Sequence, residues 1–191
     1  MELVLATNNK NKVREIKEIL GNFFDKIYTL NELGFNEDIE ETGSTFEENS
    51  LIKARAVSKM FNMVALADDS GLMVEALNGE PGVYSARYAG NHDDEANIVK
   101  LLENLKNETN RNAKFKTAIC LYYTDDTYRI ICGEVNGYIT DKKYGESGFG
   151  YDPVFFSTEL NKTFGEATLD EKNTVSHRSR ALHKLKDILS K

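Results

Sequence analysis

Two adjacent carboxylates, Asp68 and Asp69, followed by Ser70, are the side chains of this sequence best suited to chemistry. They follow the apolar residues 64–67, whose length and composition are typical of a buried strand. A buried ionised carboxylate needs a cation or donors to compensate it, so the pair suggests a hard cation such as Mg²⁺. Neighbouring strand residues point to opposite faces, so the two aspartates can have different roles. The alternative is an ordinary turn at the strand end.

A second polar stretch follows residues 3–6, an apolar run that predicts the first strand. It consists of Thr7, Asn8, Asn9, Lys10, Asn11 and Lys12. The helix predicted after it has its apolar face at Val13, Ile16, Ile19 and Leu20. A helix N-terminus offers free N–H groups and a favourable dipole to an anion, and the lysines and asparagines add charge and donors. The stretch therefore suggests an anion site, and the alternative is a helix cap with solvated lysines.

A third group lies in the glycine-rich residues 145–150 and just beyond them. Phe149, Gly150, Tyr151 and Asp152 form a loop whose aromatic rings could stack on a planar ligand. The alternative is that the aromatic rings pack into the core beside turn glycines, which is more common in general.

Basic residues stand at the start of the last predicted helix. Ser176 can cap this helix, and His177, Arg178 and Arg180 lie in its first turn. The helix dipole disfavours cations at that end, so their placement predicts an anion or a polar ligand there. The alternative is a solvated basic helix end.

Alternating strands and helices position these groups and predict an α/β fold. Further strands are expected at residues 26–30, 72–77, 115–123 and 128–135, with residues 138–139 continuing the sheet. A capping box at residues 44–47 starts a helix that ends near residue 61. In that helix Lys53 lies four residues after Asn49, so both share a side. A helix is expected at residues 93–106, and Thr168 with Glu171 caps a short turn that carries Lys172.

Composition limits the classes of function. The 191 residues predict one domain, residues 1–191, and the net charge of −7 argues against a general nucleic-acid-coating protein. The sequence has neither an apolar run of membrane-spanning length nor the pattern of a signal peptide. Two cysteines, Cys120 and Cys132, form no disulfide framework or metal motif, which favours a reduced, cytoplasmic protein.

Six motifs in order carry a resemblance to a known family. They are Thr7-x-Asn9-x-x-Lys12, Glu40-Glu41-Thr42-Gly43, Asp68-Asp69-Ser70-Gly71-Leu72, Pro81-Gly82-x-Tyr84-Ser85-Ala86-Arg87-Tyr88, Phe149-Gly150-Tyr151-Asp152-Pro153 and Ser176-His177-Arg178. Together they run from the first strand to the last helix. The chain resembles the inosine triphosphate pyrophosphatase family, which removes non-standard purine nucleotides. Asn78 and residues 165–168 depart from the family pattern, which affects local loop shape and not the chemistry.

The resemblance implies a three-layer αβα fold with a long mixed β-sheet, two lobes flanking a substrate cleft, and a homodimer. It implies hydrolysis of ITP, dITP or XTP to the monophosphate and pyrophosphate with Mg²⁺. By resemblance, Thr7 to Lys12 and Lys53 hold the triphosphate, Glu40 and Asp69 serve the metal, and Asp69 also acts as the base for water. Ser70 contacts substrate. The nucleobase side is implied to comprise Phe149, Gly150, Tyr151, Asp152, Lys172, Ser176, His177 and Arg178.

Two other functions stay open on sequence alone. One is a phosphatase that removes only the terminal phosphate, and the other is a non-catalytic nucleotide sensor. The presence of both Glu40 and Asp69 favours catalysis, because a pure binder needs no positioned base.

Overall fold

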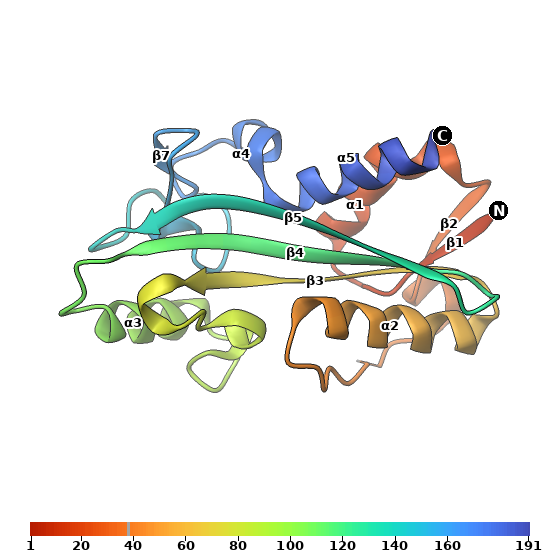
Figure 1. Ribbon diagram of the computed structural model, residues 1–191, viewed down its shortest axis with the longest axis horizontal. Coiled ribbons are helices and arrows are strands. Elements are labelled where there is room, and N and C mark those ends of the chain that lie inside the picture. Colours follow the sequence, from red (N-terminus) through yellow and green to blue (C-terminus); the bar gives the residue numbers. More distant parts are fainter. Residues whose placement is uncertain (38) are drawn as a thin grey trace. The chain divides into compact units, whose positions relative to one another are not determined.

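The computed structural model describes residues 1–37 and 39–191; Asp38, within the acidic connection between the second strand and the second helix, lies outside the described residues. The strands are β1 (Glu2–Leu5), β2 (Lys26–Thr29), β3 (Val64–Val74), β4 (Asn112–Tyr122), β5 (Tyr128–Ile139), β6 (Phe155–Ser157) and β7 (Lys162–Thr163). The α-helices are α1 (Lys10–Leu20), α2 (Phe46–Phe61), α3 (Asp94–Asn104), α4 (Leu169–Val175) and α5 (His177–Leu189). Figure 1 shows these elements along the chain.

The strands form one mixed sheet in the order β2-β1-β3-β4-β5-β6-β7. Strand β1 is parallel to both of its neighbours, and Leu3 pairs with Ile27 on one side and Val64 on the other. Strand β6 is antiparallel to β5 and to β7. The predicted α/β class with a mixed sheet is therefore confirmed.

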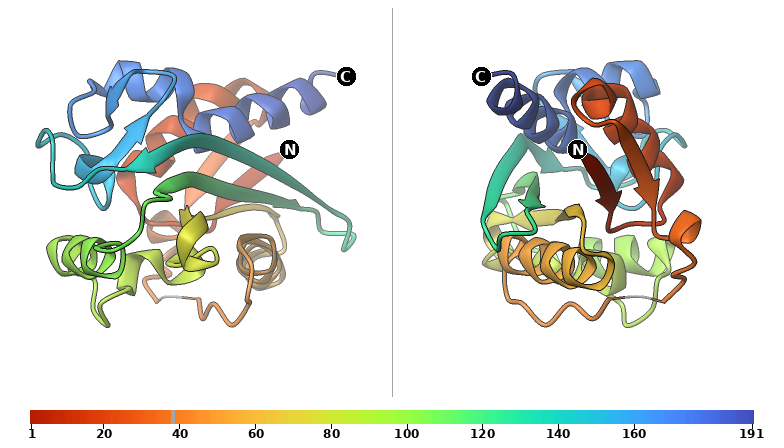
Figure 2. Two further views of the ribbon diagram at one scale, coloured as in Figure 1. Left: turned by 60° about the vertical axis from the view of Figure 1, so that its left-hand side comes forward. Right: turned by 90° about the vertical axis from the view of Figure 1, so that its right-hand side faces the viewer.

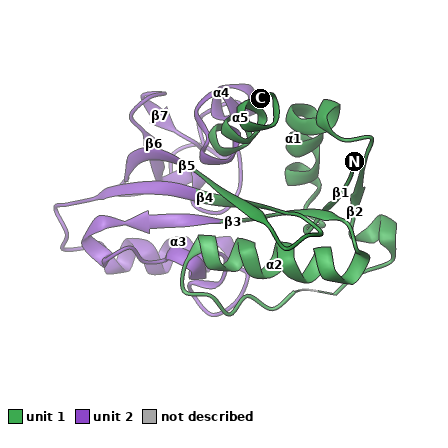
Figure 3. Cartoon of the chain, turned by 45° about the vertical axis from the view of Figure 1, so that its right-hand side comes forward, with its two compact units in different colours: residues 1–69, 117–132, 180–191 green, residues 70–116, 133–179 purple. Residues whose placement is uncertain are grey.

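The chain divides into two compact units (Figure 3). Unit 1 contains residues 1–69, 117–132 and 180–191, and unit 2 contains residues 70–116 and 133–179. Strands β3, β4 and β5 contribute residues to both units.

Unit 1 consists of three layers, because helices cover both faces of its strands. Helices α1 and α5 bury Ile16 and Leu182 against Leu66 of β3, on one face. Helix α2 buries Ala54 and Val57 against the opposite face. The right-hand view of Figure 2 shows the first two strands between α1 and α2. Because successive side chains of β3 point to opposite faces of the sheet, residues 64 and 66 face the α1 layer, while residues 65 and 67 face the α2 layer.

The winding of unit 1 places a ligand-binding position at the end of β1. The crossover through α1 leads from β1 to β2, and the crossover through α2 leads from β2 to β3, on the other side of β1. Strand order therefore reverses at β1. Open α/β sheets bind their ligands beyond the carboxyl ends of the strands at such a point. The polar stretch that starts at Thr7 follows β1 directly.

Unit 2 is organised around an aromatic cluster. The rings of Phe115 and Phe155 lie 4.7 Å apart, and those of Phe155 and Phe164 lie 5.0 Å apart. Helix α3 adds Ile98 and Leu101 to the same core. This packing supports the two loops that precede β6 and α5.

Strand β3 differs from the expectation at the two aspartates. It continues through Asp68, Asp69 and Ser70 to Val74, so the predicted strand end and the alternative turn are both wrong. Residues 75–77, expected to be strand-like, form a 3-10 turn. The strand continues because its polar groups have partners: Lys53 donates to the Asp68 carbonyl oxygen (2.7 Å), and Thr117 donates to that of Asp69 (3.1 Å).

Two smaller expectations also change. The N-cap of α2 is Thr45, which accepts from the Glu48 N–H, so the helix starts one residue later than the predicted capping box. The Glu48 carboxylate accepts the Ser44 N–H and hydroxyl instead. The apolar spacing of the last helix predicts an inward face of Leu182, Leu185, Ile188 and Leu189, but in α5 Ile188 is exposed and Ala181 packs inward.

Candidate active site

Asp68 points toward the α1 layer, where it meets Lys12. The Lys12 ammonium nitrogen lies 2.9 Å from Oδ2 and 3.1 Å from Oδ1 of Asp68. The Asp68 side chain is 1% exposed and that of Lys12 is 21% exposed. This pair compensates the burial of the carboxylate, so Lys12 has a partner within the protein in addition to its predicted role toward phosphate.

Asp69 points toward the α2 layer, where Asn49 donates from Nδ2 to its Oδ2 at 3.0 Å. Burial raises the pKa of the Asp69 carboxyl, and Glu41 adds to the rise. The charges of Lys53 and Lys12 and the Asn49 hydrogen bond oppose it. A buried carboxylate with a raised pKa, beside cations, is typical of groups that bind metal or accept protons.

Lys53 and Glu41 of the Glu-Glu-Thr-Gly motif lie on the α2 side of unit 1. Lys53 Nζ is 2.5 Å from Glu41 Oε1 and donates to the backbone of Asp68. Glu40 is exposed. Glu41 is thus the glutamate whose charge acts on Asp69, while the metal role of Glu40 stays a prediction.

The loop after β1 is ordered by its own side chains. Asn9 is the N-cap of α1 and accepts from the N–H groups of Asn11 (3.0 Å) and Lys12 (3.2 Å). Thr7 accepts from Asn9, and Asn8 accepts from the N–H of Asn31. The proposed alternative, a helix cap, is thus present. A hollow of about 620 Å³ lies beside it, lined by Asn8, Lys10, Val13, Arg14, Lys17, Glu18, Thr29 and Asn31.

The site offers few carboxylates as ligands for a metal ion. In the described ranges, 1–37 and 39–191, no three His, Cys, Asp or Glu side chains are grouped as a metal cage. The donor set still fits Mg²⁺, because this ion is commonly held by one or two carboxylates together with substrate phosphates. Burial disfavours the charged form of Asp69, and a bound cation would offset that cost. Asp69 is therefore the residue expected to hold the ion.

The predicted nucleobase group lies in unit 2, where Phe149, Asp152 and Lys172 are in contact. Phe149 is 59% exposed, and the Lys172 ammonium lies 4.7 Å from its ring centroid. Lys172 also approaches Asp152 Oδ2 at 2.5 Å, and the same oxygen accepts the Phe149 N–H at 2.9 Å. Burial raises the pKa of Asp152, and Lys172 opposes this. An exposed ring is thus held over a fixed charge pair.

Tyr151 does not present its ring to a ligand. It is 4% exposed, packs in the unit 2 core, and donates from its hydroxyl to the Ser85 carbonyl oxygen at 2.7 Å. For Tyr151 the alternative of core packing is therefore right. Phe149 alone keeps the predicted exposure, because the chain turns between the two residues at Gly150, whose φ is +58°.

The basic start of α5 is buried. Ser176 caps the helix by accepting the Ser179 N–H at 3.1 Å, as predicted. His177 and Arg178 are 9% and 8% exposed, so the alternative of a solvated helix end is wrong. The His177 ring stacks on Phe115 at 5.2 Å. Ser70 lies half-buried in β3, at the start of unit 2.

Two further residues contact the predicted site. Asn49 touches Asp69, and Asp94 accepts the Gly150 N–H at 2.8 Å. For Asn49, the only sequence signal was that it shares a helix side with Lys53. For Asp94, the sequence carried no signal of a site role.

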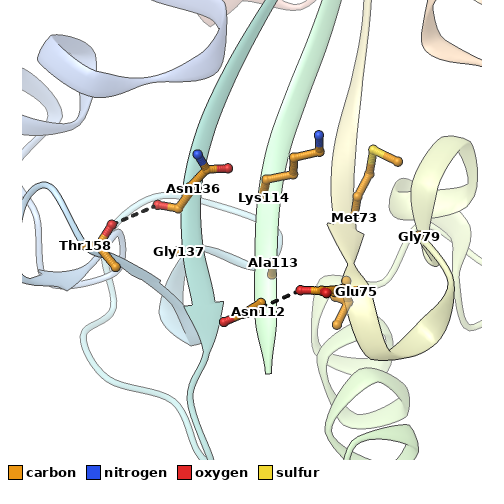
Figure 4. A pocket seen from close by; sticks show the side chains of 10 residues that line it. Met73, Glu75, Gly79, Asn112, Ala113, Lys114, Asn136, Gly137 and Thr158 are labelled. Atoms are coloured by element: carbon orange, nitrogen blue, oxygen red, sulfur yellow. Dashed lines mark hydrogen bonds between the residues drawn. The ribbon is translucent and has the colours of Figure 1, made fainter. Parts of the chain in front are cut away.

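A separate hollow of about 560 Å³ lies in unit 2, and none of the predicted site residues lines it (Figure 4). Met73, Lys114 and Asn136 project from three strands around it, and Asn112 donates to Glu75 at 3.1 Å. This hollow takes no part in the site described above.

The fold and the site define a doubly wound α/β protein with cations and buried carboxylates at its ligand-binding switch point. The family model described as the Ham1 family matches residues 3–188. The chain therefore belongs to the Ham1 family, and the resemblance inferred from the six motifs is confirmed.

Named relatives agree with this assignment. A protein of Bacillus subtilis named dITP/XTP pyrophosphatase is 49% identical over 191 residues, spanning 98% of this chain and 96% of the relative. The solved Ham1 protein of Staphylococcus aureus has a TM-score of 0.93 and 46% identity, covering 100% of this chain and 98% of that one. A dITP/XTP pyrophosphatase structure from Mycobacterium abscessus has a TM-score of 0.84 and 39% identity, covering 97% of this chain and 98% of that one.

Proposed function

We propose that this protein hydrolyses non-standard purine nucleoside triphosphates (ITP, dITP and XTP) to the monophosphate and pyrophosphate, with Mg²⁺ as cofactor. The observation that carries the proposal is the buried Asp69 carboxylate, held by Asn49 and lying near Lys12 and Lys53. The names of the similar proteins support the same substrate class. Removal of these nucleotides keeps deaminated purines out of the nucleotide pool.

Unit 1 provides the groups for phosphate chemistry. The loop from Thr7 to Lys12 and the Lys53 ammonium bind the triphosphate through donors and positive charge. Asp69 accepts a proton from the attacking water as the bridge between the α- and β-phosphates breaks and pyrophosphate leaves. Mg²⁺ held by Asp69 and Glu40 would neutralise phosphate charge and lower the pKa of the water.

Unit 2 provides the groups that read the base. The exposed Phe149 ring stacks on the purine, and Gly150, Asp152 and Lys172 hold that ring in place. Ser176, His177 and Arg178 lie at the buried start of α5. Arg178 has only donors, which suit the 6-keto oxygen of inosine or xanthine and oppose the 6-amino group of adenine.

Product identity tests the reaction. The protein with ITP and Mg²⁺ is expected to release one pyrophosphate per IMP, measured by ion chromatography with inorganic pyrophosphatase excluded. Release of phosphate and IDP would show a terminal phosphatase, and binding of ITP without product would show a sensor. ATP in the same assay measures selectivity.

We also propose that the protein acts as a cytoplasmic homodimer. The family resemblance supports the dimer, and Cys120 and Cys132, which are not joined in a disulfide, suit a reducing compartment. Among the described residues, no helix is both long and apolar enough to cross a membrane. Light scattering after size-exclusion chromatography is expected to give twice the chain mass of 21.6 kDa.

A further inference from the structure

Asn49 joins two parts of unit 1 that lie far apart in the sequence. Its side chain is buried, with 2% of the residue exposed. Its Oδ1 accepts the Gly43 N–H at 2.8 Å, and its Nδ2 donates to Asp69 Oδ2 at 3.0 Å. A backbone N–H can only donate, so the oxygen of this amide must face Gly43 and the NH₂ group must face Asp69. Both ends of the amide are therefore used, in one orientation.

Lys53 makes a second link between the same two segments, one helical turn later. Its ammonium contacts the Glu41 carboxylate at 2.5 Å and the Asp68 carbonyl oxygen at 2.7 Å. Residues four apart share a face of a helix, so Asn49 and Lys53 act on the same side of α2. The face thus holds residues 41–43 against residues 68–69 of β3.

The close approach at Gly43 explains why a glycine stands there. A Cβ at this position would lie 2.7 Å from Asn49 Oδ1 and 2.7 Å from Glu48 Cβ. Gly43 is not among the glycines with positive φ, so the requirement is for space and not for a special backbone conformation.

We propose that Asn49 is a positioning residue, which orients the Asp69 carboxylate and holds the acidic segment of residues 41–43 beside it. This inference rests on the proposed function, in which Asp69 takes the proton and Glu40 serves the metal. A carboxylate that accepts a fixed hydrogen bond keeps one orientation, and loss of such a supporting contact typically lowers metal affinity or activity. Asn49 acts through Asp69 and through the Gly43 backbone.

Two substitutions separate the two links of Asn49. Asn49→Asp keeps an oxygen for the Gly43 N–H and removes the donor to Asp69 at pH 8. Asn49→Ala removes both contacts. The matched control is Ser58→Ala, in the same helix, which deletes the hydrogen bond from a buried hydroxyl to the Met63 carbonyl oxygen at 2.7 Å. It destabilises α2 without touching the acidic segment or Asp69.

The first readout needs neither metal nor nucleotide. Amide hydrogen exchange at Gly43, followed by NMR in the metal-free protein, is expected to accelerate several-fold in Asn49→Ala. It should stay at the wild-type rate in Asn49→Asp and in Ser58→Ala. Unchanged exchange in Asn49→Ala would overturn the link to the acidic segment, whether or not the protein hydrolyses nucleotides.

The second readout is turnover of ITP. Both Asn49 variants are expected to lose about 10–100-fold in kcat with little change in KM, while Ser58→Ala keeps both values. Wild-type kcat in Asn49→Asp would overturn the positioning role. If wild-type protein releases no pyrophosphate, the proposed function fails, and the exchange data still decide the Gly43 link. Should Asn49→Ala not fold, Asn49→Asp still tests the Asp69 contact.

Discussion

At the scale of single residues, the two aspartates of β3 show how adjacent identical side chains acquire different roles. Asp68 faces Lys12 in the α1 layer, and Asp69 faces Asn49 in the α2 layer, because successive strand residues alternate between faces. The ion pair compensates Asp68, whereas burial raises the pKa of Asp69. The raised pKa of Asp69, beside Lys12 and Lys53, makes this carboxylate the candidate for metal binding and proton transfer.

Asp69→Asn is expected to lower kcat by about 10²–10⁴-fold, the usual contribution of a positioned base. The fold should persist, since asparagine has the same shape and can still accept from Asn49. Near wild-type turnover in a folded variant, checked by circular dichroism, would remove Asp69 from the mechanism.

The same substitution is expected to stabilise the metal-free protein, in a pH-dependent way. Because the folded pKa of Asp69 is raised, the folded state holds the proton more tightly than the unfolded state does. Wild-type stability therefore falls as pH rises from the ordinary aspartate pKa to the raised value, and stays lower above it. Asparagine cannot ionise, so the Tm of Asp69→Asn should exceed that of the wild type by an amount that grows between these two pKa values. The measurement is a series of thermal scans at different pH in the presence of EDTA. A constant difference would contradict this account.

Lys12→Met tests whether Lys12 also supports the fold. Loss of one partner of a fully buried ion pair costs about 3–5 kcal/mol, and the partial exposure of Lys12 places the expected loss below that range. Adding Asp68→Asn should recover part of the stability but not the KM for ITP, if Lys12 also binds phosphate. Urea denaturation and steady-state kinetics of the single and double variants measure both effects.

Phe149→Ala and Arg178→Ala are expected to differ in selectivity. Stacking accepts any purine and is worth about 1–3 kcal/mol, so Phe149→Ala should weaken ITP and ATP by similar factors. A donor matched to the 6-keto oxygen can discriminate by as much as about 10⁴, so Arg178→Ala should mainly damage ITP and XTP. The comparison uses kcat/KM for the three nucleotides. Equal losses for all of them in Arg178→Ala would assign Arg178 to phosphate.

At the scale of elements, the loop before β6 is shaped by two glycines with different constraints. Gly148 has φ +82°, and a Cβ there would lie 2.0 Å from Asp152 Oδ2. Gly150 has φ +58°, and a Cβ there would meet open space. The Asp152 carboxylate that holds Phe149 thus occupies the space beside Gly148, whereas Gly150 serves only the turn.

Gly148→Ala is therefore expected to raise the KM for ITP more than Gly150→Ala does. Both variants carry the strain of alanine at positive φ, roughly 1–3 kcal/mol, so Gly150→Ala controls for that shared cost. Only Gly148→Ala displaces Asp152 and with it Phe149. Equal effects on KM would show that strain, and not the Asp152 contact, controls this loop.

At the scale of the whole molecule, an acidic protein must bind a highly charged anion. The net charge is −7, so attraction to a triphosphate depends on individual cations such as Lys10, Lys12 and Lys53 and on a divalent cation. Ligand binding and folding are coupled, because a ligand that binds only the folded chain stabilises it.

An ITP analogue with a methylene group between the α- and β-phosphates is expected to stabilise the protein only when Mg²⁺ is present. At 100 times its Kd the gain is about 2.7 kcal/mol, or about 5–11 °C in Tm for a domain of this length. The adenine counterpart at equal concentration should have a smaller effect. Equal stabilisation by ITP analogue in EDTA would contradict the metal requirement.

The sequence by itself determined the fold class, most elements and the family. The apolar run at residues 3–6 predicted β1, which is buried on both faces, and apolar spacing predicted α1, because that helix buries one face in a core. The helix α3 and the strands β4 and β5 were also expected near their observed positions. The capping box at Thr168 and the Ser176 cap were also predicted, since such contacts join residues three apart.

Only the tertiary structure decided which polar side chains have partners, because these contacts join distant parts of the sequence. The continuous β3 through Asp68 and Asp69 depends on Lys12, Lys53 and Thr117, which no local pattern reveals. Likewise, Tyr151 is buried by the unit 2 core while Phe149 remains exposed. The Asn49 contacts span 6 and 20 residues, so only folding brings Gly43, Asn49 and Asp69 together.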